Sequence, residues 1–450
     1  MPPFMAVKQG DTPLLRSNGE AIQLDVDGPS ARLTHRLFRF PAKFHPPAIR
    51  TLIERFTDPG DHLYEPFCGS GTALVEAAIG GRRSTGVDLD PLAVMVSRAK
   101  TRRYNLDELE STSKRLLESL SRHDRGSEAY EQLQWEDISE KVYAAAIQEG
   151  KLSIPAIPNL HHWFRRYVII DLARIRLSIS QLRQINPETR GFFVLIFASI
   201  IRNSSNADPV PVSGLEVTAH MKAKDRNGRI IDPYTLYRKA LKRSLLDIKE
   251  WLELLGSNEI PTVLQGDVTE PITDGPSKVS AVITSPPYHS AVDYYRRHQL
   301  EMFWLRLTNT HAERLKLLPR YIGRARVRQS HPLLDAEWPT EGLAAEWENL
   351  LSAESEQRAR DFRHYILSMS RTFEKFAQVT ASGAPVVVVV GSSTWNGKHI
   401  PTADLFYELA GDAFEHEVPM WYPVKNRYMS YSRHNNANID KEYVVVLRRK

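Results

Sequence analysis

A strand, a glycine turn and a helix follow one another near the start of this chain, and this order restricts the fold more than any other feature. Residues 62–65 have the character of a short strand, and the turn after them contains Gly69 and Gly71. Residues 73–79 then have the composition of a helix. Glycine permits positive φ angles and lets a ligand approach the backbone closely. The unit predicts the first part of a doubly wound α/β sheet.

An acid follows at the end of the next predicted strand. Residues 84–87 form this strand, and Asp88 comes directly after it. A carboxylate in this place commonly binds ribose hydroxyls, with a usual spacing of roughly 20 residues from the glycine turn. Asp88 therefore strengthens the prediction of a nucleotide-binding half of the sheet.

The segment Thr284-Ser285-Pro286-Pro287-Tyr288 follows an apolar run, 279–283, that is typical of a buried strand. Its two prolines remove two N–H donors and keep the chain extended. The rigid loop presents a serine hydroxyl, carbonyl oxygens and a tyrosine ring. A flat heterocycle could stack on Tyr288 while its amino group donates to Ser285 and to the Pro286 carbonyl. A plain strand-terminating turn is the alternative interpretation.

Together, the two motifs resemble those of the exocyclic-amino DNA methyltransferases, the N4-cytosine and N6-adenine enzymes that use S-adenosylmethionine. The resemblance rests on Glu-Pro-Phe-Cys-Gly-Ser-Gly-Thr at 65–72 and on the Ser-Pro-Pro-Tyr loop. It covers 35–105 and 262–305 well and the C-terminal strands loosely. It implies a Rossmann-like methyltransferase sheet, mostly parallel with an antiparallel C-terminal strand, and a large, mainly helical insertion.

The resemblance also implies the residues of the site. Residues 38–46 resemble the family's N-terminal cofactor segment, 86–91 its ribose-binding turn, and 265–267 the third-strand acid near the cofactor adenine. Glu65 stands where the family more often has Asp, and we expect its carboxylate near the methionine ammonium. The implied cofactor-binding residues are Lys43, Phe44, His45, Glu65, Phe67, Gly69, Ser70, Gly71, Thr72, Asp88 and Asp267. The implied catalytic residues are Ser285, Pro286, Pro287 and Tyr288.

Ser285 bears on which base is modified. A hydroxyl both donates and accepts, so it can match the N4 amine and the N3 acceptor of cytosine. Adenine enzymes of the family more often carry Asp or Asn here, so we favour N4-cytosine and keep N6-adenine as the alternative. A base in a duplex must be flipped out to reach such a loop, and Tyr288 would give it a stacking surface.

Other groups near the loop have two interpretations. Tyr294, Tyr295 and Trp304 either line the base pocket or belong to the core. His289, Asp293 or His298 could take the proton lost after methylation, and solvent could also do so. The spacing of His and Cys residues suggests no metal site.

Motif spacing predicts the organisation of the chain. Residues 1–34 form a loosely structured extension, and 35–105 with 262–450 form the catalytic domain. Residues 106–261 are a helical insertion and a candidate target-recognition region, and 306–358 are a second insertion and a candidate DNA contact. The helices expected in the first insertion are 107–120, 130–148, 162–184, 192–202 and 234–255, with an extended loop at 203–233. In the C-terminal part we expect a helix at 359–380, a buried strand at 385–391, a helix at 402–411 and an antiparallel pair, 414–418 with 442–447.

Charge is informative through its distribution. The net charge is only +5, which does not identify a nucleic-acid binder. Basic residues nevertheless crowd two stretches, and such groups neutralise phosphates. The first stretch contains Arg314, Lys316, Arg320, Arg324, Arg326 and Arg328, for which we favour DNA contact. The second contains Arg226, Arg229, Arg238, Lys239, Lys242 and Arg243, for which a solvated helix face is an equal alternative.

Two further segments are candidates for DNA contact. Asn203, Ser204, Ser205, Asn206 and Asp208 carry groups that could read base edges, although any loop has similar residues. Residues 425–433 interleave basic and aromatic side chains between the last two strands, and a plain surface hairpin is the alternative there.

Composition agrees with an intracellular enzyme. The chain has 450 residues, 42% of them hydrophobic, and one cysteine, Cys68, which excludes an intramolecular disulfide and is more typical of a small filler than of a nucleophile. The longest apolar run, 192–201, is too short to span a bilayer. We expect no membrane association and a cytoplasmic location in a prokaryotic cell, close to the nucleoid.

Three functions follow from the sequence. The first is a DNA methyltransferase acting on double-stranded DNA, for which a cognate restriction endonuclease or another defence component is a candidate partner. The second is an RNA amino-methyltransferase, although those enzymes usually have Asp or Asn before the prolines and carry an RNA-binding appendage. The third is a catalytically silent DNA-binding subunit, against which both intact motifs argue.

Overall fold

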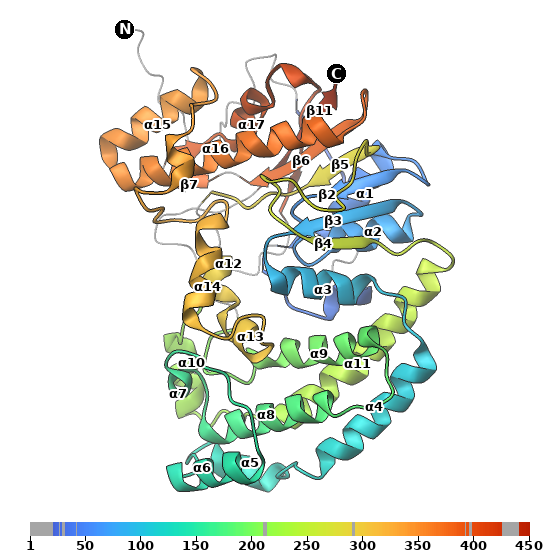
Figure 1. Ribbon diagram of the computed structural model, residues 1–450, viewed down its shortest axis with the longest axis vertical. Helices are drawn as coiled ribbons and strands as arrows, with labels where there is room; N and C mark the ends of the chain where they lie inside the picture. Colours follow the sequence, from blue (N-terminus) through green and yellow to red (C-terminus); the bar gives the residue numbers. More distant parts are fainter. Residues whose placement is uncertain are drawn as a thin grey trace.

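The computed structural model describes residues 21–26, 28, 32–41, 43–209, 214–289, 293–391, 393–395, 398–424 and 441–450. Within these residues, a large sheet occupies one end of the molecule and a layered helical region the other, as Figure 1 shows. The sheet strands are β1 (Ile22–Gln23), β2 (His62–Glu65), β3 (Arg83–Asp88), β4 (Thr262–Gln265), β5 (Ala281–Thr284), β6 (Pro385–Gly391), β9 (Phe414–His416), β10 (Met420–Pro423) and β11 (Lys441–Arg449).

Strand order gives the sheet a reversal point. Its strands run in the order β1-β10-β11-β6-β5-β2-β3-β4, and β9 also pairs with β11. The strands β4, β3, β2, β5 and β6 are parallel, whereas β11 is antiparallel to both β6 and β10. The chain moves outward from β2 to β3 and β4, then crosses back to β5 and β6. This is the predicted mostly parallel, Rossmann-like sheet with an antiparallel C-terminal strand, and a ligand is expected where the order reverses.

Helices cover both faces of the sheet. One face packs against α15 (Leu343–Glu354), α16 (Glu356–Val379) and α17 (Thr402–Ala410). The other packs against α1 (Pro46–Phe56) and α2 (Thr72–Ile79), and the front and back views show the two layers. Alternate residues of β6 serve the two cores, Val386 and Val388 on one side and Val387 on the other. A run of buried valines is expected for a parallel strand covered on both faces.

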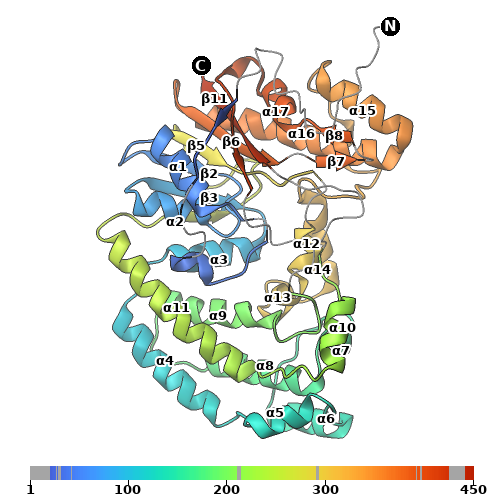
Figure 2. The same cartoon turned by 180° about the vertical axis from the view of Figure 1, so that it is seen from behind.

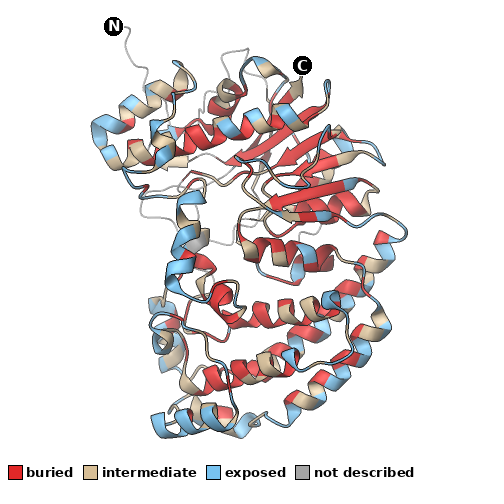
Figure 3. Ribbon diagram, viewed as in Figure 1, coloured by how far each residue is buried: buried red, intermediate tan, exposed pale blue. Residues whose placement is uncertain are grey.

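The insertion after β3 is helical, as predicted. It follows α3 (Pro91–Thr101), which lies between the sheet and α9 in Figure 1. Its helices are α4 (Leu106–Ser121), α5 (Ser127–Leu133), α6 (Glu140–Glu149), α7 (Leu160–Trp163), α8 (Arg166–Ser180), α9 (Pro187–Ile201), α10 (Ala219–Arg226) and α11 (Pro233–Leu255). Figure 3 shows that α9 is largely buried while the outer helices α5 and α6 expose one side.

The helix predicted at 130–148 is two helices, α5 and α6, because a side chain between them has another role. The Asp137 carboxylate accepts the backbone N–H groups of Arg166 (2.7 Å) and Tyr167 (3.2 Å), which begin α8. These N–H groups have no partner within their own helix. Similarly, the predicted helix 162–184 is divided into α7 and α8, and the predicted loop 203–233 contains α10.

The second insertion is irregular. The short helices α12 (Tyr294–Arg297) and α13 (Gln299–Trp304) precede it, and α14 (His311–Leu317) begins its helical part. Two 3₁₀ turns, Leu318–Arg320 and Pro332–Asp335, lead from α14 to α15. Strands β7 (Ser393–Trp395) and β8 (Lys398–Ile400) form a separate hairpin that the sequence analysis did not predict.

Part of the expected N-terminal extension belongs to the sheet. Residues Ile22 and Gln23 pair with β10 in parallel, and Leu24 and Val26 are buried in the core beside α1. The expectation of a loose segment is therefore wrong for 21–26, because its apolar side chains cover the sheet beside β10. Across the part of the chain that the structure describes, no helix combines the length and apolar character needed to cross a membrane.

Candidate functional site

The two sequence motifs meet at the reversal point of the sheet. The glycine turn follows β2 and the Ser-Pro-Pro-Tyr loop follows β5, and these strands are paired neighbours. Because the strands are parallel, both segments leave at the same edge of the sheet. A hydrogen bond also joins the strand ends, since the Thr284 hydroxyl donates to the Glu65 carboxylate.

Contacts with α3 fix the conformation of the glycine turn. Gly69 and Gly71 have φ angles of 49° and 74°. A Cβ at Gly71 would lie 3.2 Å from the Ser97 Cα, so only glycine fits without moving α3. Ser97 Oγ donates to the Gly69 carbonyl and Lys100 Nζ to the Ser70 carbonyl, each at 2.7 Å. The turn therefore directs these carbonyl groups toward α3.

A cavity lies in front of the turn and extends to the catalytic loop. It encloses about 870 Å³, including its open mouth. Ten residues predicted from the sequence line it: Lys43, Phe44, Phe67, Gly69, Ser70, Thr72, Asp88, Asp267, Ser285 and Pro287. Five other predicted residues are not part of its lining: His45, Glu65, Gly71, Pro286 and Tyr288. The structure thus brings most of the glycine motif and two of the four predicted catalytic residues to one cavity.

Asp88 is fixed by backbone groups. Its Oδ2 accepts the Gly69 N–H and its Oδ1 accepts the Asp90 N–H, both at 2.8 Å. Burial, with a smaller contribution from Asp90, raises the pKa of Asp88 to about 7. A carboxylate held in this way keeps lone pairs free to accept the hydroxyls of a sugar.

Asp90 also lines the cavity, and the sequence analysis did not name it as a site residue. It caps α3 by accepting the Leu92 N–H (2.8 Å), and its other oxygen bonds to His298 Nδ1 (2.9 Å) and the Tyr321 hydroxyl (3.0 Å). Burial raises the pKa of Asp90, but His298, the Leu92 N–H and the Tyr321 hydroxyl together outweigh burial and hold the pKa below its ordinary value. An acid directly before a proline is a local sequence signal for such a cap, whereas the other partners of Asp90 are distant in sequence.

Glu65 lies beneath the cavity. One oxygen accepts from Thr284 and from the Phe67 N–H (3.2 Å), while Oε2 has no hydrogen-bond partner among the described residues. Burial raises the pKa of Glu65 to about 8. A buried carboxylate oxygen without a partner is costly, and a donor such as an ammonium group would satisfy it.

Other polar atoms in the lining also lack partners. Ser70 Oγ and Thr72 Oγ1 are buried and have no hydrogen bond within the described parts of the chain. Lys43 lines the cavity nearby, and burial lowers the pKa of its ammonium group. Hydroxyls and an ammonium group suit the carboxylate of an amino acid, and Asp88 suits a ribose. The donor set therefore fits S-adenosylmethionine, which has an amino-acid end and a ribose.

Asp267 has partners on both oxygens. Its Oδ1 accepts from the Thr269 N–H (3.1 Å) and hydroxyl (2.7 Å). Its Oδ2 forms an ion pair with Arg320 at 3.3 Å, and Arg320 also contacts Glu270 at 3.4 Å. Arg320, Tyr321 and Ile322 of the second insertion line the cavity, which the sequence analysis did not predict.

The catalytic loop is braced by the C-terminal strands. The Tyr288 hydroxyl donates to Glu442 Oε1 on β11 at 2.9 Å, and the Tyr422 hydroxyl on β10 donates to the other oxygen. Burial and then Glu442 raise the pKa of Tyr288 well above its ordinary value, while a hydrogen bond with Ser285 opposes the shift. Glu442 and Tyr422 were missed because their relation to the loop is set by strand order and has no local sequence signal.

Three groups near the loop were candidates for taking a proton. His289 is buried against Phe362 and Tyr365, and burial lowers its pKa to about 4. Asp293 caps α12, where it accepts the N–H of Arg296, and His298 is paired with Asp90. Each of the three therefore has a structural role.

The aromatic residues near the loop have different positions. Tyr294 lines the cavity, with its ring stacked 6.2 Å from that of Phe40. Trp304 is fully buried in the helical core, as its alternative interpretation held. The side chain of Tyr295 lies outside the described residues, as does the predicted hairpin contact at 425–433.

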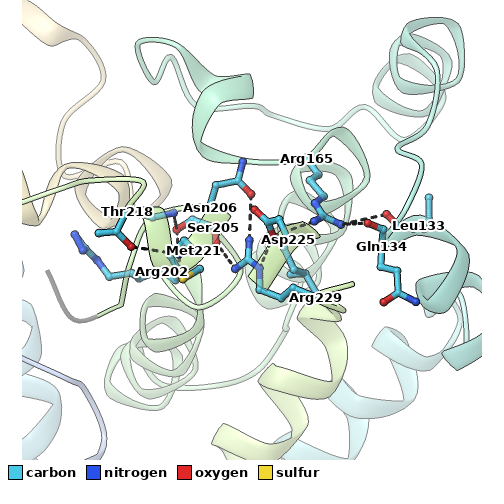
Figure 4. A network of polar contacts seen from close by, with 12 residues as sticks. Leu133, Gln134, Arg165, Arg202, Ser205, Asn206, Thr218, Met221, Asp225 and Arg229 are labelled. Atoms are coloured by element: carbon cyan, nitrogen blue, oxygen red, sulfur yellow. Dashed lines mark hydrogen bonds and ion pairs between the residues drawn. The ribbon is translucent and has the colours of Figure 1, made fainter. Parts of the chain in front are cut away.

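Ser205 and Asn206 belong to a polar network inside the helical region, which Figure 4 shows. Ser204 and Ser205 are fully buried. Asn206 accepts from Arg229 Nη2 at 3.2 Å, and Arg229 Nη1 donates to the Ser205 carbonyl at 2.9 Å. The hypothesis that the two serines read base edges is wrong, because their hydroxyls cannot reach a ligand from inside the helical region.

The basic stretches are only partly exposed. Arg314 is buried and donates to Gln299, and Arg324 donates to the carbonyls of Leu318 and Arg326. In the second stretch, Arg229 and Arg238 form ion pairs. The exposed members of the two groups are Lys316, Arg320, Arg326, Arg328, Arg226, Lys239, Lys242 and Arg243.

Comparison with known proteins adds to this geometry. Residues 55–128 match the family described as RMKL-like, methyltransferase domain. The chain is 24% identical to the type II methyltransferase M.MvaI of Kocuria varians over 92% of its own length and 91% of the relative's. It is 21% identical to the type II methyltransferase M.MjaII of Methanocaldococcus jannaschii, over 59% of this chain and 61% of that protein.

A shorter match concerns an RNA enzyme. The chain is 32% identical to the tRNA (guanine(10)-N2)-dimethyltransferase of Methanothermobacter thermautotrophicus, over 18% of this chain and 24% of the relative. The strand order, the glycine turn at its reversal point and the fit of the cavity agree with these similarities. This chain is a methyltransferase with a Rossmann-like fold, and its cofactor is S-adenosylmethionine.

Proposed function

We propose that the chain is a site-specific DNA methyltransferase that modifies the N4 amine of a cytosine flipped out of duplex DNA. The observation that carries the proposal is the shared cavity, which Ser285 and Pro287 line together with the glycine turn. Similarity to one type II methyltransferase, M.MvaI, over almost the whole chain supports DNA as the substrate. N6-adenine is the alternative target, and the match to a tRNA enzyme favours RNA only over a short segment.

The chemistry assigned to the loop follows from the nature of the amine. Its lone pair is delocalised into the base, so it is a poor nucleophile. S-adenosylmethionine supplies a methyl group on a positively charged sulfur. The chain's own contribution is position and electrostatics. We assign the Ser285 hydroxyl and the Pro286 carbonyl as acceptors for the two amine hydrogens, which localises the lone pair for in-line attack.

The contacts of Tyr288 give Ser285 a defined orientation. The Tyr288 hydroxyl donates to Glu442, so it has lone pairs to accept the Ser285 proton. With its proton directed there, Ser285 Oγ presents lone pairs to the amine. Glu442 acts through Tyr288 and is a positioning residue in this scheme. The Tyr288 ring would offer its face to the base.

The residue type at 285 supports the choice of cytosine, because adenine enzymes of the resembling family more often carry Asp or Asn before the prolines. With its proton directed to Tyr288, the Ser285 hydroxyl acts only as an acceptor for the amine. Adenine also has an amine beside a ring acceptor, so adenine stays the second candidate. A cognate endonuclease remains part of the proposal, because the type II relatives take their name from restriction-modification systems.

The experiment is methyl transfer with purified chain, isotope-labelled S-adenosylmethionine and three substrates: duplex DNA, single-stranded DNA and tRNA. Nucleosides from the labelled product are identified by mass spectrometry. We expect N4-methylcytosine in duplex DNA. N6-methyladenine alone would establish the alternative base, and label confined to tRNA would overturn the DNA assignment.

A substitution at Ser285, with a matched control, tests whether the catalytic loop carries the methyl-transfer activity. Ser285→Ala removes one acceptor at the amine, and groups of this kind are worth about 10²–10³ in rate. We expect such a loss with cofactor affinity nearly unchanged, as measured by calorimetry. Ser280→Ala is the control, since this serine precedes β5 and bonds to the His62 N–H. Equal activity of the Ser285→Ala and wild-type enzymes would remove Ser285 from the mechanism.

A further inference from the structure

A short segment of the second insertion forms part of the wall of the cofactor cavity. We define residues 318–327 as the strap. Arg324 stiffens it by donating to the carbonyls of Leu318 and Arg326, both at 2.9 Å. Asp361 of α16 anchors its end by accepting the N–H groups of Arg326 (3.0 Å) and Val327 (2.8 Å). The strap is thus a built element of the fold.

One side of the strap faces the cofactor cavity. Arg320, Tyr321 and Ile322 are consecutive, and all three line it. Arg320 pairs with Asp267, which follows β4, and the Tyr321 hydroxyl donates to Asp90, which follows β3. Two neighbouring strap residues therefore bridge to the acids at the ends of two neighbouring strands.

The other contact of the strap is with the catalytic loop. Gly323 has a φ angle of 75°. A Cβ built on Gly323 would lie 2.9 Å from the Tyr288 carbonyl oxygen and 3.5 Å from that of Pro287. Any side chain here would push against the backbone of the loop that carries Ser285. The glycine therefore lets the strap pass directly along this loop.

We propose that the strap recognises the adenosyl part of the cofactor and couples its binding to the position of the catalytic loop. Arg320 and Tyr321 are assigned as cofactor-recognition residues, and Gly323 as a positioning residue. The planar guanidinium of Arg320 can pack on a flat, electron-rich ring, and Ile322 adds apolar surface. The inference rests on the S-adenosylmethionine site and is independent of which base is methylated.

The contacts of Arg320 favour this role over phosphate binding. The guanidinium already faces two carboxylates, those of Asp267 and Glu270, and it lines the cavity. A cation in this place complements the acids at the strand ends. The sequence pattern predicts a DNA contact for Arg320 and its neighbours, and the experiments below separate that role from cofactor binding.

The first experiment measures cofactor and DNA binding of Arg320→Ala separately. We expect the Kd for S-adenosylmethionine, measured by calorimetry without DNA, to rise roughly tenfold. The salt dependence of DNA binding should stay unchanged. Arg371→Ala, which removes an exposed arginine on α16 outside the cavity lining, is the control for loss of a positive charge.

Two results would overturn the assignment of Arg320. One is an unchanged or lower Kd for the cofactor, which would mean that the Arg320 guanidinium only forms its ion pair with Asp267. The other is a weaker DNA affinity with a salt slope reduced by about one, which is the mark of a lost phosphate contact. Failure of the proposed function would instead appear as wild-type protein that binds cofactor and methylates no DNA.

The second experiment tests the coupling through Gly323→Ala. The control is Gly383→Ala, because Gly383 has a similar φ of 76° but an added Cβ there meets nothing within 4 Å. Both variants carry the backbone strain, and Gly323→Ala adds the contact with the loop backbone. We expect kcat to fall at least about tenfold and the cofactor Kd to rise for Gly323→Ala only, because coupling between two sites is reciprocal. Equal kcat values for the two variants would refute the coupling.

Discussion

At the scale of single residues, the ends of β2 and β3 carry carboxylates that are unusually hard to ionise. Burial raises the pKa of Glu65 to about 8 and that of Asp88 to about 7. At pH values between the ordinary pKa of each carboxyl group and its raised pKa, the folded protein binds more protons than the unfolded chain. Stability therefore falls as pH rises through this window, and the cost is complete above it. Carboxylates whose pKa values are shifted in this way are typical of functional sites.

Replacing Glu65 should remove part of the loss in folding stability that ionisation of these carboxyl groups causes. Glu65→Gln keeps the shape and an acceptor for Thr284 but cannot ionise. At pH 8 we expect the variant to exceed the wild type in free energy of unfolding by on the order of a few kcal/mol, and the gap should close toward pH 4.5. Urea titrations at several pH values measure it. A gap independent of pH would show that ionisation of Glu65 is not its source.

Residues of the site divide into those found from sequence and those found only from the fold. Gly69, Asp88 and Ser285 belong to local motifs, so their spacing along the chain sufficed. Glu442 and Arg320 are separated from these motifs by long stretches of chain, and only strand order and the course of the second insertion bring them to the site. Such partners lie outside the reach of local patterns.

At the scale of elements, β10 and β11 do more than complete the sheet. Tyr422 on β10 and Glu442 on β11 are directly paired in register, and Glu442 bonds to both Tyr422 and Tyr288. A rigid strand pair thus holds the outer end of the catalytic loop. Sites supported by strands are positioned more precisely than sites supported by loops.

Removing the brace should slow methyl transfer without affecting the cofactor. Glu442→Ala leaves the Tyr288 hydroxyl without its acceptor, at a cost of about 1–3 kcal/mol. We expect activity to fall roughly tenfold and the cofactor Kd to stay within about twofold. Glu442→Gln should restore part of the activity, because its amide oxygen still accepts one hydrogen bond.

Glu415→Ala on β9, an exposed acid, serves as the control for that measurement. It should match the wild type in both activity and cofactor affinity. If Glu442→Ala weakened cofactor binding as much as activity, or if Glu442→Gln were no better than Ala, Glu442 would have a general structural role. Labelled-methyl transfer and calorimetry distinguish these cases.

The helical elements show what sequence patterns can and cannot locate. Strands β2 and β6 were predicted with the bounds that the structure has, because glycines lie at or near the ends of both and β6 is a continuous apolar run. The break between α5 and α6 was missed, because Asp137 caps a different helix. Periodicity reports the face of one helix, whereas a cap between two helices depends on tertiary structure.

At the scale of the whole molecule, the helical insertion shares its core with the catalytic part. One continuous cluster contains Leu92 and Val96 of α3, Phe193 of α9, and Trp251 of α11. Such a shared core is not expected of separately folding domains. In the front and back views α3 lies between the sheet and the insertion helices.

This continuity predicts a single unfolding transition. Far-UV circular dichroism and tryptophan fluorescence should give coincident urea curves, since Trp251 and Trp304 are buried in the shared core. Amides of α9 and of β6 should exchange hydrogen with similar free energies of opening. Earlier exchange throughout α9, with β6 still protected, would show that the insertion unfolds independently.

The place of β11 in the sheet has a consequence for the timing of activity during synthesis. Residues 441–449 pair with β6 and β10, and they are translated long after β2 and its glycine turn. At typical synthesis rates the interval is roughly 20–75 s. Throughout that time a nascent chain has the glycine turn but has neither the strand that joins β6 to β10 nor the acid that braces Tyr288. We therefore expect methyl transfer to begin only after residue 449 has emerged.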